Sequence, residues 1–88
     1  MRISGFNWDE WNIHHIAQHN VTPQEVEEAS FNQSICRKTK GGLYLIYGQS
    51  DAGRYLFTVI RLQHQQIAYV ITSRNMTAAE QNYYRKER

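Results

Sequence analysis

Residues 43–74 read LYLIYGQSDAGRYLFTVIRLQHQQIAYVITSR. Three segments of this stretch are rich in β-branched and aromatic side chains, as strands are: LYLIYG (43–48), RYLFTVIRL (54–62) and QIAYVITSR (66–74). The connections QSDAG (49–53) and QHQQ (63–66) are short, and strands joined by short connections pair as antiparallel neighbours. The stretch therefore predicts an antiparallel meander. LYLIYG is apolar on both faces and is expected to be a central strand.

Two further segments outside this stretch also predict strands. QSICRKTK (33–40) is heavily charged and alternates weakly, which favours an edge strand joined to the meander through Gly41 and Gly42. ISGFNW (3–8) alternates apolar and polar side chains and predicts a short strand near the N-terminus.

The clearest helix start lies in VTPQEV, residues 21–26. Thr22 is placed as an N-cap and Glu25 as its capping-box partner, while Pro23 occupies the first helical position, where no N–H is needed. Val21 and Val26 are spaced as a hydrophobic staple. The sequence therefore predicts a helix that ends near Ser30.

Two more helices are expected on similar grounds. Asp9 can cap a helix that runs to about His19, and Asn20 suits the left-handed position that follows a helix end. Thr77 and Glu80 form another T-x-x-E capping box, which opens a closing helix.

The expected order of elements is β-α-α-β-β-β-β-α. It predicts one α+β domain over residues 1–88: an antiparallel β-meander sheet, two N-terminal helices packed on one face and a C-terminal helix at the end.

Composition is that of a small globular domain: of 88 residues, 41% are hydrophobic and 20% charged. No apolar run approaches the ~18 residues of a membrane span, no signal peptide is evident, and Cys36 has no second cysteine to pair with. We expect a cytoplasmic protein with no membrane association.

Charge is unevenly distributed along the chain, whose net charge is +2. Residues 1–32 carry one basic and five acidic side chains, a net −4, and residues 33–88 carry nine basic and three acidic, a net +6. A basic second half can attract a polyanion such as RNA, and it can equally be a solvated surface that keeps the protein soluble.

Histidines are clustered in HHIAQH, residues 14–19. His15 and His19 are four residues apart and share a helical face, a spacing that can hold zinc, but a third ligand and an H-E-x-x-H pattern are lacking. We expect no metal and no cofactor.

Arginines at strand ends are the other candidates for chemistry. Arg54 begins one strand and Arg74 ends the next, so in an antiparallel pair both are expected at the same end of the sheet, where they could hold one phosphate. Tyr83 and Tyr84 on the closing helix could add a hydroxyl and a stacking face. The structural alternative is that the arginines point to water and the tyrosines pack on the sheet.

Three quoted stretches resemble BrnT-family toxins: FNWDEWNIHHIAQHNVTPQEVEEA (6–29), GRYLFTVIR (53–61) and ITSRNMTAAEQNYY (71–84). The resemblance covers nearly the whole chain. It implies a RelE-like ribonuclease toxin of a bacterial type II toxin–antitoxin pair, which cleaves RNA without a metal and is neutralised by a cognate DNA-binding antitoxin.

Five positions match the family pattern and are carried over from it: His19, Arg54, Arg74, Glu80 and Tyr84. Of these, Arg54 and Arg74 are expected to stabilise charge in the reaction, Tyr84 to orient or protonate, and His19 to titrate in a useful range, whereas the capping box already accounts for Glu80. The candidate RNA-binding residues are Lys38, Lys40, Arg61 and Tyr83.

Two departures from the family pattern bear on activity. Gln18 stands where the family often has a base, and Asn20 where it has glycine. The first departure, with the lack of an evident acid–base pair, keeps a second hypothesis open: a non-catalytic RNA- or protein-binding module with the same fold. The sequence also leaves a homodimer open.

Overall fold

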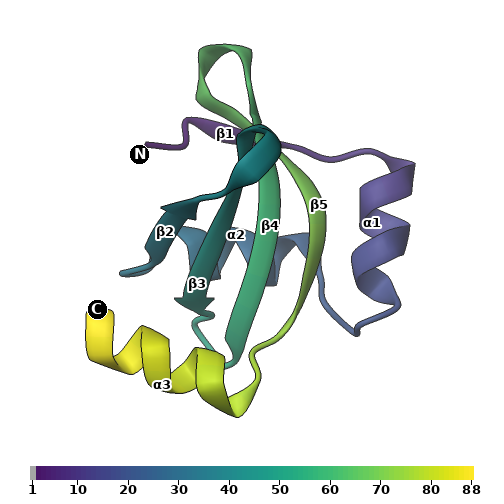
Figure 1. The fold of residues 1–88 in the computed structure, drawn as a ribbon. Helices are drawn as coiled ribbons and strands as arrows, with labels where there is room; N and C mark the ends of the chain where they lie inside the picture. The colour runs from purple at the N-terminus through teal and green to yellow at the C-terminus, as the bar shows by residue number, and fades with distance from the viewer. Residues whose placement is uncertain (1) are drawn as a thin grey trace.

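The computed structural model of the protein describes residues 2–88. Its five-stranded sheet has the order β1-β5-β4-β3-β2. Four strands form the expected antiparallel meander, with β2 at one edge (Figure 1): β2 (Ile35–Lys38), β3 (Leu43–Gln49), β4 (Tyr55–Gln63) and β5 (Ile67–Asn75). Short 3₁₀ turns, η1 (Lys40–Gly42) and η2 (His64–Gln66), join β2 to β3 and β4 to β5.

The remaining strand shows that the prediction of a wholly antiparallel sheet is wrong. β1 (Gly5–Asn7) runs parallel to β5 at the other edge, so the sheet is mixed. The tight turns of the meander enforce antiparallel pairing, but β1 is followed by two helices. Those helices carry the chain to the far edge of the sheet, where β2 begins, and they leave the direction of β1 unrestricted.

The three expected helices are present, and each begins at the predicted cap. α1 (Glu10–Ala17) is capped by Asp9, α2 (Pro23–Phe31) by Thr22 and α3 (Ala78–Glu87) by Thr77, all three with reciprocal capping-box hydrogen bonds. Asn20 adopts the expected left-handed conformation with φ of 59°. None of the helices among residues 2–88 is long and apolar enough to cross a membrane.

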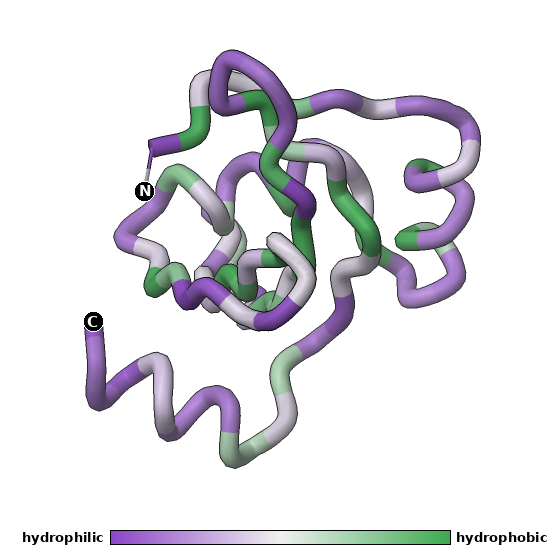
Figure 2. Tube along the Cα trace, turned by 45° about the horizontal axis from the view of Figure 1, so that its top comes forward, coloured by the Kyte–Doolittle hydropathy of each residue, from purple (hydrophilic) through white to green (hydrophobic). Residues whose placement is uncertain are grey.

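Two apolar clusters lie on opposite faces of the sheet. The larger cluster joins α1 and α2 to one face and is centred on Ile16, Val26, Leu56 and Ile60. The smaller cluster lies where α3 crosses the end of the other face, and it contains Tyr47, Met76 and Tyr84. In Figure 2 many hydrophobic segments lie in the middle of the molecule, whereas the helical segment that ends at the C-terminus, α3, is mostly hydrophilic. Away from α3, this second face, which we call the open face, has no helix over it.

Gly48 explains how closely α2 approaches the sheet. A Cβ atom at this position would lie 1.9 Å from the backbone oxygen of Ala29. Only a residue without a side chain allows this contact, so Gly48 fixes the separation between α2 and β3.

Candidate functional site

Arg54 and Arg74 lie on opposite faces of the sheet. In the β4–β5 ladder Arg74 is the partner of Phe57, a residue of the open face, whereas Arg54 reaches the connection between α1 and α2 on the other face. The expectation that the two guanidinium groups converge on one phosphate is therefore wrong.

A β-bulge in β5 is the reason. Ile60 pairs with Val70, but Val59 pairs with Thr72, so Ile71 is an extra residue without a partner in the ladder. One extra residue reverses which face every later side chain occupies. With regular pairing, Arg74 would lie opposite Leu56 and share a face with Arg54.

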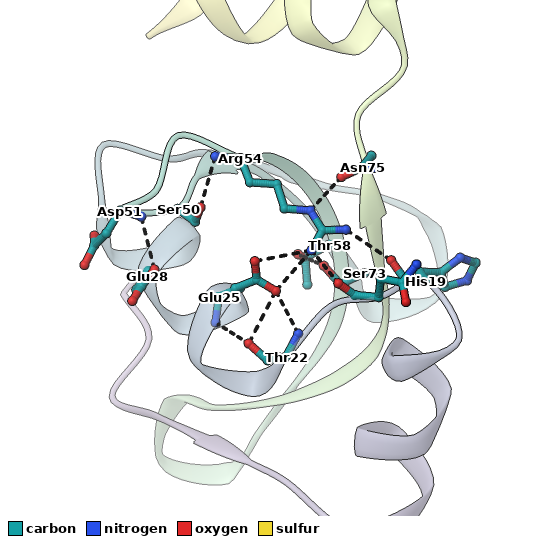
Figure 3. A network of polar contacts seen from close by, with 11 residues as sticks. His19, Thr22, Glu25, Glu28, Ser50, Asp51, Arg54, Thr58, Ser73 and Asn75 are labelled. Carbon is teal, nitrogen blue, oxygen red and sulfur yellow. Dashed lines mark hydrogen bonds and ion pairs between the residues drawn. The ribbon is translucent and has the colours of Figure 1, made fainter.

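Arg54 acts as a clamp between separate parts of the chain (Figure 3). Its guanidinium donates to both carboxylate oxygens of Glu25 at 3.1 and 3.3 Å, to the carbonyl oxygens of His19 and Asn20, and to Oδ1 of Asn75 at 2.8 Å. Burial alone would raise the pKa of Glu25, but hydrogen bonds from Thr22 and Arg54 outweigh burial and hold that pKa below its usual value. Each of the three guanidinium nitrogens of Arg54 therefore donates at least one hydrogen bond that holds the fold together.

Arg74 forms the second ion pair, and this one lies on the open face. Its two terminal nitrogens donate to the two carboxylate oxygens of Glu80 at 2.8 and 2.9 Å. The hydrogen bond from Arg74 lowers the pKa of Glu80, and the same contact raises the pKa of Arg74. Glu80 also accepts the backbone N–H of Thr77 at 2.8 Å. One carboxylate thus caps α3 and fixes Arg74 beside it.

The other two candidate catalytic residues, Tyr84 and His19, do not form one site with either arginine. Tyr84 is 1% exposed, and its hydroxyl donates to the carbonyl of Gln33 at 3.0 Å, which gives it a structural role. The imidazole of His19 points away from the Arg54 clamp, as Figure 3 shows, and lies edge-on to His15, which stacks on Trp11 of α1.

Side chains of the open face instead form a continuous row with an arginine at each end, which we call the aromatic row. Its members in order are Arg37, Tyr83, Tyr47, Phe57 and Arg74. The guanidinium of Arg37 lies 5.3 Å from the ring centre of Tyr83, and Arg74 lies 4.4 Å from that of Phe57. Between them, the ring centres of Tyr83 and Tyr47 are 4.9 Å apart, and those of Tyr47 and Phe57 are 5.3 Å apart.

Of the four candidate RNA-binding residues, only Tyr83 belongs to this row. Lys38, Lys40 and Arg61 are exposed at the other end of the sheet, around the β2–β3 turn, where Arg61 donates to the carbonyl of Gly41 at 3.1 Å. The structure thus separates the basic residues of the meander into two groups.

Sequence reasoning missed three members of the row: Arg37, Tyr47 and Phe57. The pairing of strands could have identified them, because residues that are partners in a ladder lie on the same face of the sheet. Tyr47 is the partner of Phe57, and Arg37 is the partner of Leu45, which is two residues from Tyr47 in β3 and therefore on the same face. Using that signal requires the strand register, which the sequence alone does not give.

Two hollows lie elsewhere on the surface, and neither includes the aromatic row. One, of about 360 Å³, lies beside Cys36, and burial raises the pKa of this thiol, which makes it a poor nucleophile. The other, of about 500 Å³, lies on α1 around Trp11 and His15. Within residues 2–88, no group of three or more His, Cys, Asp or Glu side chains is arranged to hold a metal ion.

Comparison of the chain with known protein families, with curated proteins and with solved structures finds no match.

Proposed function

We propose that the protein binds single-stranded RNA across the aromatic row and cleaves it without a metal, as a RelE-like toxin of a bacterial type II toxin–antitoxin pair. The single observation that supports RNA as the ligand is the row itself: two partly exposed rings, Tyr83 and Phe57, which flank the buried Tyr47 and lie between two guanidinium groups on a sheet face that no helix covers beyond α3. The cleavage and the antitoxin are what the BrnT resemblance implies.

The chemistry of the row suits a nucleic-acid strand. Aromatic side chains stack on unpaired bases and contribute about 1–3 kcal/mol per base, with little dependence on sequence. Arginine forks bind phosphate oxygens. Among residues 2–88, the two carboxylate ion pairs involve Arg54 and Arg74, so Arg37 has its charge available for a phosphate. Arg37 and Tyr83 are therefore the residues on which RNA binding should depend most.

The proposed reaction is an internal transfer at phosphorus. The 2′-oxygen of one nucleotide attacks the adjacent phosphorus, an O2′–P bond forms, and the P–O5′ bond breaks. The products carry a 2′,3′-cyclic phosphate and a 5′-hydroxyl. The 2′ proton is released, and the departing 5′-oxygen gains one. Arg37, which is in neither of the carboxylate ion pairs found among residues 2–88, is the candidate that stabilises the extra negative charge on the phosphate oxygens.

The test is incubation of purified protein with labelled single-stranded RNA in the presence of EDTA. We expect fragments that end in a 2′,3′-cyclic phosphate, and we expect Arg37→Gln combined with Tyr83→Ala to reduce cleavage by at least about tenfold. Arg61→Gln is the matched control, because it removes the same charge at the other end of the sheet. Failure of the wild-type protein to bind or cut RNA would refute the proposal.

A second candidate function is the non-catalytic module. It is favoured by the burial of Tyr84 and by the engagement of Arg54 and Arg74 with carboxylates, which leave the expected catalytic residues dispersed. In the same assay this candidate predicts RNA that is bound by the row and remains intact. A cognate antitoxin would be identified by co-expression with the neighbouring open reading frame and co-purification.

A further inference from the structure

Two more arginines, Arg85 in α3 and Arg88 directly after it, lie outside the aromatic row and form a cluster with residues at the end of the sheet. We infer that its members bind a backbone phosphate of the same RNA strand, one that continues from the aromatic row across α3; the inference rests on the proposed function. This Tyr55 cluster consists of Gln49, Tyr55, Arg85 and Arg88.

Contacts across the end of the sheet hold the cluster together. Gln49 and Tyr55 are partners in the β3–β4 ladder. Arg85 places its Nε and one terminal nitrogen each 3.4 Å from the Tyr55 hydroxyl oxygen, with its guanidinium carbon 5.2 Å from the ring centre. Arg88 donates to the side-chain oxygen of Gln49 at 3.5 Å. Two guanidinium groups are thus gathered beside one phenol.

Helix geometry separates this cluster from the aromatic row. Successive residues are about 100° apart around a helix, so Tyr83 and Arg85 project about 200° apart, on either side of Tyr84. Arg88 is one turn from Tyr84 and Arg85, and its guanidinium lies 5.2 Å from the Tyr84 ring centre. Tyr84 itself is buried against the sheet. A strand that leaves the row and crosses the exposed side of α3, past Asn82 and Lys86, would therefore reach Arg85 and Arg88 on the far side of the helix.

The two arginines of the cluster differ from Arg54 and Arg74 in their ion pairing. Neither Arg85 nor Arg88 is in the ion pairs found among residues 2–88, in contrast to Arg54 and Arg74. Arg85 is also close enough to lower the pKa of Tyr55, through its hydrogen bonds first and its charge second. Two exposed guanidinium groups, a phenol and an amide supply the hydrogen-bond donors that a phosphodiester needs, and neither ion pair of residues 2–88 occupies these guanidinium groups.

The inference is tested by binding of 2′-O-methyl oligouridylates, which lack the attacking hydroxyl and cannot be cleaved by the proposed reaction. Fluorescence anisotropy compares a strand of about three nucleotides, enough for the row, with one of about twelve, enough to cross α3. Arg85→Gln with Arg88→Gln should weaken binding of the longer strand about tenfold and leave the shorter one unchanged. The slope of log affinity against log salt should become less steep by about 0.7 for each lost phosphate contact.

Lys40→Gln with Arg61→Gln is the matched control, since it removes two charges at the other end of the sheet, away from α3. Tyr55→Phe keeps the ring and removes the hydroxyl, and it should weaken the longer strand only. Equal losses for the control and for the variant that combines Arg85→Gln with Arg88→Gln, or equal losses for both strand lengths, would overturn the inference.

Failure of the proposed function gives a different result. If the wild-type protein binds neither strand, titration with inorganic pyrophosphate is followed by NMR at the Arg85 Nε–H and Tyr55 ring signals. Shifts that Arg85→Gln abolishes would retain the cluster as a site for another phosphate ligand. Absence of shifts would overturn the cluster as a phosphate site altogether.

Discussion

Replacement of Arg54 by glutamine separates a structural role for this arginine from the catalytic role that the BrnT resemblance implies. The variant removes the clamp that joins the α1–α2 connection to the start of β4 and the end of β5. It leaves the aromatic row untouched, because Arg54 lies on the other face of the sheet. We therefore expect lower stability and, in the protein that remains folded, unchanged RNA binding.

The size of the effect follows from the contacts of the clamp. Removing the donor from a hydrogen-bonded carboxylate costs about 1.5–3 kcal/mol. Thr22 still donates its backbone N–H to Glu25, and the side chains of Arg54 and Glu25 are 24% and 27% exposed, so water relieves part of the loss. The two carbonyl acceptors can also be rehydrated. We expect the free energy of unfolding to fall by about 2 kcal/mol, which in a domain of this size lowers Tm by about 8–16 °C.

Urea unfolding followed by circular dichroism and tryptophan fluorescence measures this change. Arg61→Gln is the control: Arg61 is exposed and donates only to the Gly41 carbonyl, so its loss should change stability by less than about 0.5 kcal/mol. A double-mutant cycle with Glu25→Gln should show a coupling energy of about 1 kcal/mol.

Two results would refute the reasoning. A loss below about 0.5 kcal/mol for Arg54→Gln would mean that the clamp contributes little to the fold. Loss of RNA cleavage by a fully folded Arg54→Gln protein would assign Arg54 to the reaction, as the resemblance implies, and would remove the aromatic row from its central place.

Three further changes test other parts of the structure. Gly48→Ala should destabilise by more than about 2 kcal/mol, since its methyl group would meet the Ala29 carbonyl, and a stable variant in urea unfolding would contradict the close approach of α2. Glu80→Gln should lower the free energy of unfolding by about 1 kcal/mol near pH 7 and by progressively less below about pH 4.5. The pKa of Glu80 in the folded protein is lower than its value of 4.5 in the unfolded chain, so the ionised carboxylate stabilises the fold above pH 4.5, and this contribution is lost as the pH falls through the folded pKa. If the difference in unfolding free energy between the variant and the wild type does not shrink in acid, the ion pair with Arg74 is not the source of that difference. Tyr84→Phe should cost about 1 kcal/mol by thermal unfolding, from the hydrogen bond to the carbonyl that precedes β2, with RNA cleavage retained, whereas lost cleavage at unchanged Tm would place this hydroxyl in the reaction.

The sequence alone determined the features that depend on neighbours along the chain. The N-cap and its partner at the third helical position are three residues apart, so Thr22 with Glu25 and Thr77 with Glu80 specify two helix starts without reference to the rest of the fold. The short turns of residues 49–53 and 63–66 likewise specify antiparallel pairing of β3, β4 and β5, because tight connections permit no other direction. The structure confirms these helix starts and strand pairings because each depends only on residues close together in the sequence.

The tertiary structure alone decided which side chains meet. The bulge at Ile71 turned Arg74 onto the open face, away from Arg54, and it is visible only in the pairing of β5 with β4. The same long-range pairing brought Glu25 to Arg54 across 29 residues and assembled Arg37, Tyr47 and Tyr83 from three separate elements. A phosphate-binding surface depends on distances between residues far apart in sequence, and those distances are fixed only when the strands take their register and the helices dock on the two faces.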